Sequence, residues 1–254
     1  MNRFAAYPSL AGRSVVVTGG ASGIGASIVE HFARQGAKTG FIDIDAGAGN
    51  KLAARLSGEG FSVSFAHADL TDITALKNAL ATMERAHGPA QVLVNNAGHD
   101  DRHAIESVTP AYFDERIAVN LRHQFFAAQA VLPAMKAAKA GVIINLGSTS
   151  WHLKVPGMPL YLAAKAAVEG LTRALARDLG EHNIRVNCVV PGWVMTERQL
   201  EKWVTAEGEA EIMKNQCLKE KLHPADIARM VMFLAADDSR LITAQSFIVD
   251  GGWT

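Results

Sequence analysis

Short apolar segments alternate with amphipathic segments along almost the whole chain. The first apolar segment, SVVVTG at 14–19, is β-branched and stops at a glycine, which is typical of a buried strand. The segment at 24–36 repeats its apolar residues at helical spacing and ends at Gly36, a residue type that commonly ends helices. The same reasoning predicts strands at 14–19, 38–45, 62–70, 91–98, 141–148, 183–192 and 245–252, and helices at 24–36, 46–57, 72–87, within 110–139, at 160–180 and at 224–236.

The order of these segments favours an α/β fold. Strands that are almost entirely apolar and alternate with helices indicate a parallel sheet covered on both faces. No linker or low-complexity stretch interrupts the pattern, so residues 1–254 are predicted to form a single domain. A polar segment around 193–222, which contains Met and Trp, departs from this alternation of strands and helices. This segment leaves the end of a predicted strand, where α/β sheets bind ligands, and we expect it to cover the substrate.

Charge and cysteine content argue against several classes of function. The 25 basic residues balance 25 acidic ones and form no basic block, so neither nucleic acid nor an anionic membrane is expected as a partner. Cys188 and Cys217 are too few for a disulfide framework or a four-thiolate zinc site. No apolar run reaches transmembrane length, and the first residues lack the apolar core of a secretory signal. We therefore expect a soluble, cytoplasmic protein.

A glycine-rich turn, TGGASGIG at 18–25, lies between the first predicted strand and the first predicted helix. Glycines there let a pyrophosphate approach the backbone and the positive end of the helix. Asp43 ends the second predicted strand, eighteen residues beyond Gly25, where a carboxylate can accept both ribose hydroxyls of an adenosine. The alternative is a tight turn followed by a solvated aspartate. A carboxylate at this place would repel a 2′-phosphate, and 18–25 and 41–50 contain no Lys or Arg, so NAD is favoured over NADP.

Tyr161 and Lys165 stand four residues apart in LYLAAKAAVEGLTRALARDL, a run that reads as helix throughout. Four residues is about one helical turn, so the phenol and the ammonium leave from the same face. The spacing alone does not distinguish a surface contact from a tyrosine that exchanges a proton.

Four motifs in this order resemble the short-chain dehydrogenase/reductase family: TGxxxGxG at 18–25, NNAG at 95–98, a serine at 148 and YxxxK at 161–165. The resemblance spans the whole chain. It implies a Rossmann-like doubly wound sheet of seven parallel strands, a nicotinamide cofactor and, usually, a homotetramer. It also implies that the cofactor contacts Gly19, Ser22, Gly23, Ile24, Gly25, Asp43, Asp69, Leu70, Asn96, Ala97, Gly98, Tyr161, Lys165, Pro191, Gly192, Val194 and Thr196.

The same resemblance assigns catalytic roles. Tyr161 is similar to the family's general acid/base, Lys165 to its electrostatic partner and ribose ligand, and Ser148 to the donor to the substrate oxygen. Asn120, in AVNLRH, matches an asparagine that holds a water for proton relay. A free tyrosine has a pKa of about 10, and a neighbouring ammonium and a positive nicotinamide ring both favour the phenolate. We therefore expect a lowered pKa, which would let Tyr161 take a proton from an alcohol.

A narrower likeness concerns the substrate. YPSLAGR, NNAGHDDRH, FDERIAVNLRH, GSTSWHL and QCLK resemble bacterial aldose 1-dehydrogenases of the D-xylose type, which oxidise the anomeric hydroxyl of a pyranose to a lactone. His99 departs from the asparagine expected in that pattern. A sugar needs many hydrogen-bond partners and aromatic faces. The residues predicted to bind the substrate are His99, Asp101, Ser148, Trp151, His152, Tyr161 and Trp193, with Asp100, Arg102 and His103 as further polar candidates.

Several alternatives remain open from the sequence. Residues 100–103 could form a solvated loop or an internal salt-bridge cluster, and Trp151 and Trp193 could pack at the rim of the cleft. His99 and His103 lack a third ligand nearby, so no metal site is predicted. The substrate could instead be another alcohol, a polyol, a 3-oxoacyl group or a steroid. A non-catalytic nucleotide-binding scaffold is the remaining alternative.

Overall fold

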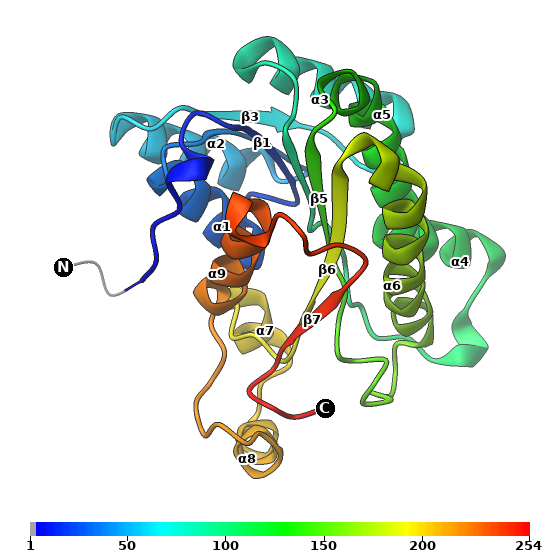
Figure 1. The fold of residues 1–254 in the computed structure, drawn as a ribbon. Coiled ribbons are helices and arrows are strands. Elements are labelled where there is room, and N and C mark those ends of the chain that lie inside the picture. The colour runs from blue at the N-terminus through cyan, green and yellow to red at the C-terminus, as the bar shows by residue number, and fades with distance from the viewer. Residues whose placement is uncertain (1–3) are drawn as a thin grey trace.

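The computed structural model describes residues 4–254 and contains a sheet of seven parallel strands (Figure 1). The strand order is β3-β2-β1-β4-β5-β6-β7. The chain therefore builds outward from β1 to β3 and then returns to place β4 on the other side of β1. Ligands of α/β folds bind at such a reversal, beyond the carboxyl ends of the strands. The strands are β1 (Ser14–Thr18), β2 (Lys38–Asp43), β3 (Val63–His67), β4 (Val92–Asn95), β5 (Gly141–Leu146), β6 (Ile184–Pro191) and β7 (Ser246–Val249).

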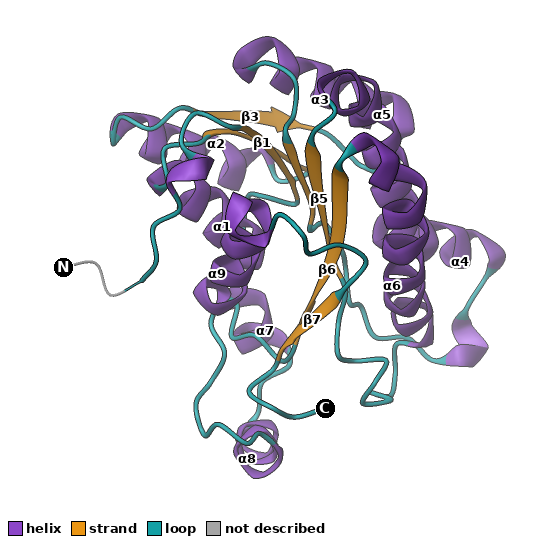
Figure 2. Ribbon diagram, viewed as in Figure 1, coloured by secondary structure: helices purple, strands orange, loops and turns teal. Residues whose placement is uncertain are grey.

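Helices cover both faces of the sheet, as Figure 2 shows. Along β1, Val15 and Val17 join the apolar core on one face while Val16 joins the core on the other, so all three valines are buried. The first core receives α1 (Gly23–Arg34), α2 (Ala46–Gly58) and α9 (Pro224–Ala235). The second receives α3 (Ile73–His87), α5 (His123–Ala138) and α6 (Pro159–Leu179). The predicted α/β fold, with seven parallel strands in one domain, is confirmed.

Two predicted elements differ in detail. The helix expected within 110–139 is divided into α4 (Pro110–Ile117), a π-helical turn (Ala118–Arg122) and α5. A π-helical turn inserts an extra residue into a helix and is frequent at functional sites. Several strands also end earlier than predicted; β4, for example, stops at Asn95 instead of reaching Gly98. The residues beyond Asn95 leave the sheet and turn toward the cleft described below.

The segment around 193–222 contains two helices, α7 (Glu197–Lys202) and α8 (Ala206–Asn215). In Figure 1, α8 projects from the body of the molecule at the end of the sheet where β6 finishes. That this segment covers the substrate stays a prediction. Short 3₁₀ segments occupy Pro8–Leu10, Ile105–Ser107, Gly180–His182 and Asp237–Ser239. Within residues 4–254, no helix combines the length and the apolar character needed to cross a membrane.

Candidate active site and cofactor cleft

A cavity of about 1060 Å³ opens at the carboxyl ends of the strands. Every residue predicted to contact the cofactor lines it, from Gly19 in the first turn to Thr196 before α7. The volume exceeds the upper range of pockets for drug-sized ligands, roughly 1,000 Å³, so it can hold a dinucleotide beside a small substrate. The fold thus brings together residues that are spread over nearly 180 positions of the chain, although their contact with a cofactor stays a prediction.

The turn between β1 and α1 requires glycine at two positions because neighbouring backbone lies too close for a side chain. A Cβ on Gly25 would stand 1.8 Å from the carbonyl oxygen of Gly19, and a Cβ on Gly19 would stand 2.7 Å from the Cα of Ala97. Gly19 also has a φ of 65°, which favours glycine. The Asn96 side-chain amide fixes the turn by donating to the Gly19 carbonyl at 2.8 Å.

The N-terminus of α1 fits the pyrophosphate of a dinucleotide. Within the described chain, the Ser22 side chain makes no capping hydrogen bond, and the first turn of α1 has no acidic residue. The N–H groups of Gly23, Ile24 and Gly25 belong to the first helical turn, where no earlier helical carbonyl accepts from them. All three residues line the cavity. Uncapped donors and the positive end of the helix dipole together bind anions.

Asp43 ends β2 and lines the same cavity. Its two carboxylate oxygens accept from the backbone N–H groups of Ala21 at 2.9 Å and of Asp45 at 3.0 Å. A carboxylate has about four acceptor positions, so two remain for ribose hydroxyls. Between Gly19 and Leu70, the described cavity wall contains no Lys or Arg. A 2′-phosphate would thus meet a fixed negative charge with no cation on this side of the cleft.

Tyr161 and Lys165 lie on α6 and both line the cavity. Lys165 is only 2% exposed, its Nζ donates to the carbonyl oxygen of Leu146 at 2.8 Å, and the same Nζ lies 5.6 Å from the centroid of the Tyr161 ring. Ser148 follows β5, lies close enough to the Tyr161 phenol to lower its pKa, and has its Oγ 2.8 Å from the Oγ of Ser150. Ser148, Tyr161 and Lys165, all predicted to be catalytic, therefore line the same cavity.

The expected lowering of the tyrosine pKa is wrong for the protein alone. Burial raises the pKa of Tyr161, the charge of Asp100 raises it further, and the hydrogen bond with Ser148 only partly offsets these effects. Burial also lowers the pKa of Lys165 to about 8. The physical reason is that removing water disfavours the charged form of both groups.

Asn120 sits in the π-helical turn and is fully buried. Its Oδ1 accepts from the His99 N–H at 2.8 Å, while its Nδ2 donates to the carbonyl oxygens of Arg116 at 3.0 Å and His99 at 3.2 Å. A Cβ on Gly98 would stand 3.2 Å from both Asn120 Oδ1 and Lys165 Nζ, so these atoms meet beneath the loop that follows β4. The Asn120 side chain thus holds this loop, and the predicted water relay stays a prediction.

On the substrate side of the cavity, His99 and Trp193 line the wall as predicted. Arg116 donates to Nδ1 of His99 at 2.9 Å; because arginine can only donate, His99 is neutral with its proton on Nε2. Burial lowers the pKa of His99, which is consistent with that state. The indole Nε1 of Trp193 donates to the side chain of Gln199 in α7 at 3.0 Å.

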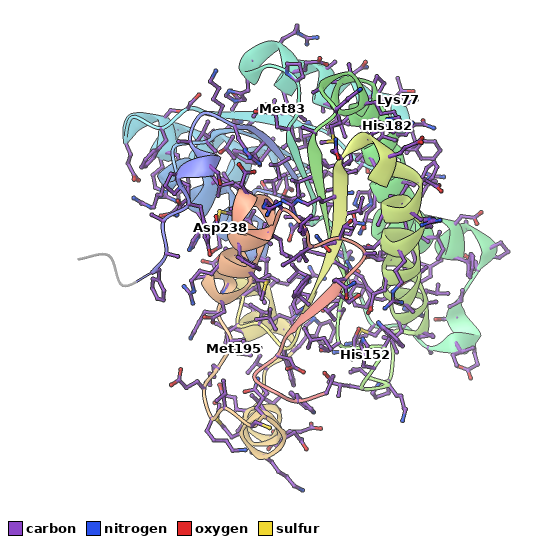
Figure 3. All side chains as sticks on the ribbon, viewed as in Figure 1. Lys77, Met83, His152, His182, Met195 and Asp238 are labelled. Carbon is purple, nitrogen blue, oxygen red and sulfur yellow. The ribbon has the colours of Figure 1, made fainter. Side chains whose placement is uncertain are left out.

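Trp151 and His152 do not line the cavity, contrary to the prediction. Their rings stack with centroids 3.8 Å apart, and their side-chain nitrogens lie 2.9 and 3.1 Å from Oε1 of Glu169 on α6. The other carboxylate oxygen of Glu169 accepts from Ser246 of β7 at 2.8 Å. His152 is labelled in Figure 3, below the sheet and near α6. A buried carboxylate on α6 therefore holds both rings outside the cavity wall.

Asp101 is also absent from the cavity wall as described for residues 4–254. Its Oδ1 accepts from Arg198 of α7 at 2.7 Å, and its Oδ2 lies 3.2 Å from His99 Nδ1. The salt-bridge cluster that the sequence left open for this loop therefore exists. Asp100 and Arg102, further candidates from the sequence, do line the cavity. Sequence reasoning missed other parts of the wall, because loop residues and short helices carry no periodic signal; the additional lining residues include Leu153, Val155, Pro156, Met158, Arg198, Gln199 and Trp253.

Within residues 4–254, the structure contains no group of three or more His, Cys, Asp or Glu side chains that could hold a metal ion.

Comparison with known proteins also indicates an oxidoreductase. Residues 19–254 match a family model described as enoyl-(acyl carrier protein) reductase. The chain is 51% identical to a D-xylose 1-dehydrogenase of Caulobacter vibrioides, covering 98% of both chains, and 45% identical to a probable galactose dehydrogenase of Rhizobium meliloti, covering 97% of this chain and 96% of the other.

Among solved structures, the fold is similar to that of a blue fluorescent protein from a metagenomic library in complex with NADPH. The TM-score is 0.88 at 34% sequence identity, and the match covers 97% of this chain and 99% of the other. The motifs, the cleft and these similarities agree. The chain belongs to the short-chain dehydrogenase/reductase family, and it is an oxidoreductase that uses a nicotinamide dinucleotide.

Proposed function

We propose that this protein is an NAD-dependent aldose 1-dehydrogenase. Its substrate would be the pyranose form of a pentose such as D-xylose or L-arabinose, or a hexose such as galactose, and its product the aldonolactone. The observation that carries the proposal is the meeting of Ser148, Tyr161 and Lys165 in a cleft whose wall also contains the polar side chains of His99, Asp100 and Gln199. The similarity to sugar dehydrogenases over almost the full chain supports it.

In this reaction the anomeric carbon loses a hydride and its hydroxyl loses a proton. A nicotinamide cofactor, when bound, would accept the hydride and, while oxidised, would carry a positive charge. Tyr161 takes the hydroxyl proton, and Ser148 holds the same oxygen by a hydrogen bond. The carbon–oxygen bond becomes the carbonyl of the lactone, which water can then open without the enzyme.

The ammonium of Lys165 favours the phenolate form of Tyr161, which is the form that accepts a proton. Its hydrogen bond to the Leu146 carbonyl fixes the ammonium at the end of β5, below the phenol. With its pKa lowered to about 8, Lys165 is still mostly protonated at neutral pH. A protonated Lys165 together with a positive nicotinamide would offset the burial and the Asp100 charge that raise the pKa of Tyr161.

Asp43 supports NAD as the cofactor instead of NADP. Its carboxylate is fixed by two backbone donors and keeps acceptor positions for ribose hydroxyls. The family resemblance further suggests a homotetramer in the cytoplasm. Light scattering on the purified protein measures the assembly directly, and a monomer would contradict that part of the proposal.

A substrate panel tests the function. The protein is supplied with NAD and, in turn, pentoses, hexoses, linear polyols and a steroid alcohol, and reduction of the nicotinamide is followed by absorbance. We expect the aldoses to be oxidised, and hydroxylamine to trap the lactone as a hydroxamate. Brisk oxidation of a polyol or steroid without lactone from any aldose would replace the proposal by another activity of the family. No turnover with any substrate would favour the non-catalytic scaffold.

A further inference from the structure

Asp100 lies in the loop that follows β4 and lines the cavity with its side chain only 18% exposed. Its Oδ2 accepts a hydrogen bond of 2.7 Å from Nε2 of Gln199. Within the described chain, its Oδ1 has only an ion-pair contact, with Arg198 Nε at 3.5 Å, which is longer than a normal hydrogen bond. The carboxylate therefore keeps unused acceptor positions at the cavity.

Asp101, the adjacent carboxylate, is held differently. Its Oδ1 accepts from Arg198 at 2.7 Å, its Oδ2 lies 3.9 Å from Nη1 of Arg116, and Asp101 does not line the cavity. Two aspartates next to each other in sequence thus have different surroundings. Asp101 ties the loop after β4 to α7, whereas Asp100 stands at the cavity.

Gln199 holds Asp100 in a fixed orientation. The Trp193 indole donates to Oε1 of Gln199 at 3.0 Å, and this contact fixes the amide so that its Nε2 points at Asp100. All three residues line the cavity. The chain of contacts runs from the end of β6 through α7 to the loop after β4, so it spans the substrate side of the cleft.

The negative charge of Asp100 opposes formation of the phenolate of Tyr161. Asp100 lines the same cavity as Tyr161 and Lys165, and its charge raises the pKa of both. A negative charge there makes Tyr161 a poorer source of phenolate. Sugar hydroxyls are hydrogen-bond donors, and hydrogen bonds to a charged acceptor are strong, so binding of such hydroxyls would compensate for this effect.

We propose that Asp100 accepts hydrogen bonds from hydroxyls of the sugar other than the one oxidised, and that Gln199 is the positioning residue that presents it. This inference rests on the proposed function. It also predicts that apolar alcohols are poor substrates, because they would bury the Asp100 carboxylate without offering it a donor.

The test compares wild type with Asp100→Asn on D-xylose and on its 2-, 3- and 4-deoxy derivatives. With D-xylose, kcat/KM should fall roughly 10- to 150-fold, the range for a hydrogen bond to a charged group. With at least one deoxy sugar the loss should shrink at least threefold, because the partner hydroxyl is already missing. NAD affinity, measured by fluorescence, should stay within about threefold. An equal loss on all four sugars would overturn the proposal, because an altered pKa of Tyr161 would affect every sugar alike.

Two further variants complete the design. Asp114→Asn makes the same chemical change on exposed α4, away from the cavity, and should leave kcat/KM unchanged. Gln199→Leu should lose less than Asp100→Asn, and the double variant should lose less than the product of the two single losses. If the loss in the double variant equals the product of the two single losses, Gln199 does not act through Asp100. Wild type that oxidises no aldose would refute the proposed function; an active wild type with an unaffected Asp100→Asn would refute only this inference.

Discussion

The Nζ atom of Lys165 lies 5.6 Å from the centroid of the Tyr161 ring, one helical turn away on α6. Its hydrogen bond goes to the carbonyl of Leu146 and not to the phenol. The lysine therefore acts on the tyrosine through charge at short range, in a site where burial disfavours both ionised forms. This relationship makes the chemistry sensitive to both side chains and to pH.

Tyr161→Phe should nearly abolish turnover while leaving NAD affinity within a few-fold, because only the phenolic proton is removed. Initial rates with an aldose and NAD titrations followed by fluorescence measure the two quantities. A tenfold loss of turnover corresponds to a rise of about 1.4 kcal/mol in the activation free energy. If the variant kept a tenth or more of wild-type turnover, the assignment of Tyr161 as the base would be wrong.

Lys165→Met should inactivate the enzyme yet raise its thermal stability near neutral pH, since it removes a buried ammonium. The pKa of Lys165 falls from its ordinary 10.5 to about 8 on folding. Between these values the unfolded chain binds more protons than the folded one, so wild-type stability rises with pH in this window. The difference in Tm between variant and wild type should therefore narrow from pH 8 toward pH 10.5. A difference that does not change with pH would contradict the buried-charge interpretation.

Asp43→Ala should weaken NAD binding and narrow its advantage over NADP, because the ribose hydroxyls lose an acceptor and the 2′-phosphate loses a repelling charge. The ratio of kcat/KM for the two cofactors is the measurement, since loosening of the turn at Ala21 would affect both equally. Asp72→Ala removes a helix-capping carboxylate of α3 outside the cavity and is the control, with an unchanged ratio. Equal use of both cofactors by the wild type would count against the role given to Asp43.

Trp151→Phe should lower the stability of the fold while leaving KM for the sugar almost unchanged. The variant removes the donor to Glu169 at 2.9 Å, and a hydrogen bond to a charged group contributes about 1.5–3 kcal/mol. Denaturant unfolding should show this loss, and KM for D-xylose should change less than about threefold. A tenfold rise in KM with unchanged stability would instead show that Trp151 binds the substrate, as the sequence predicted.

The sequence by itself determined the architecture and the reacting groups. Seven apolar strands alternating with helices leave a parallel sheet as the arrangement that buries both faces, and β1 illustrates it with Val15, Val16 and Val17 all buried. The glycine turn was recognisable from its place between a strand and a helix, whereas a role for the Tyr161–Lys165 pair, one helical turn apart, was predicted only through the family resemblance. Each is encoded within eight residues of chain.

The tertiary structure decided which polar side chains of the loops face the substrate. Asp100 and Asp101 are neighbours in sequence, but Arg198 and Gln199, almost a hundred residues later, bind them differently and leave only Asp100 at the cavity. Glu169 likewise draws Trp151 away from it. The pKa of Tyr161 also depends on burial, which its helical spacing from Lys165 does not reveal. Loops have no repeat to fix side-chain direction, so partners that only the fold brings near determine it.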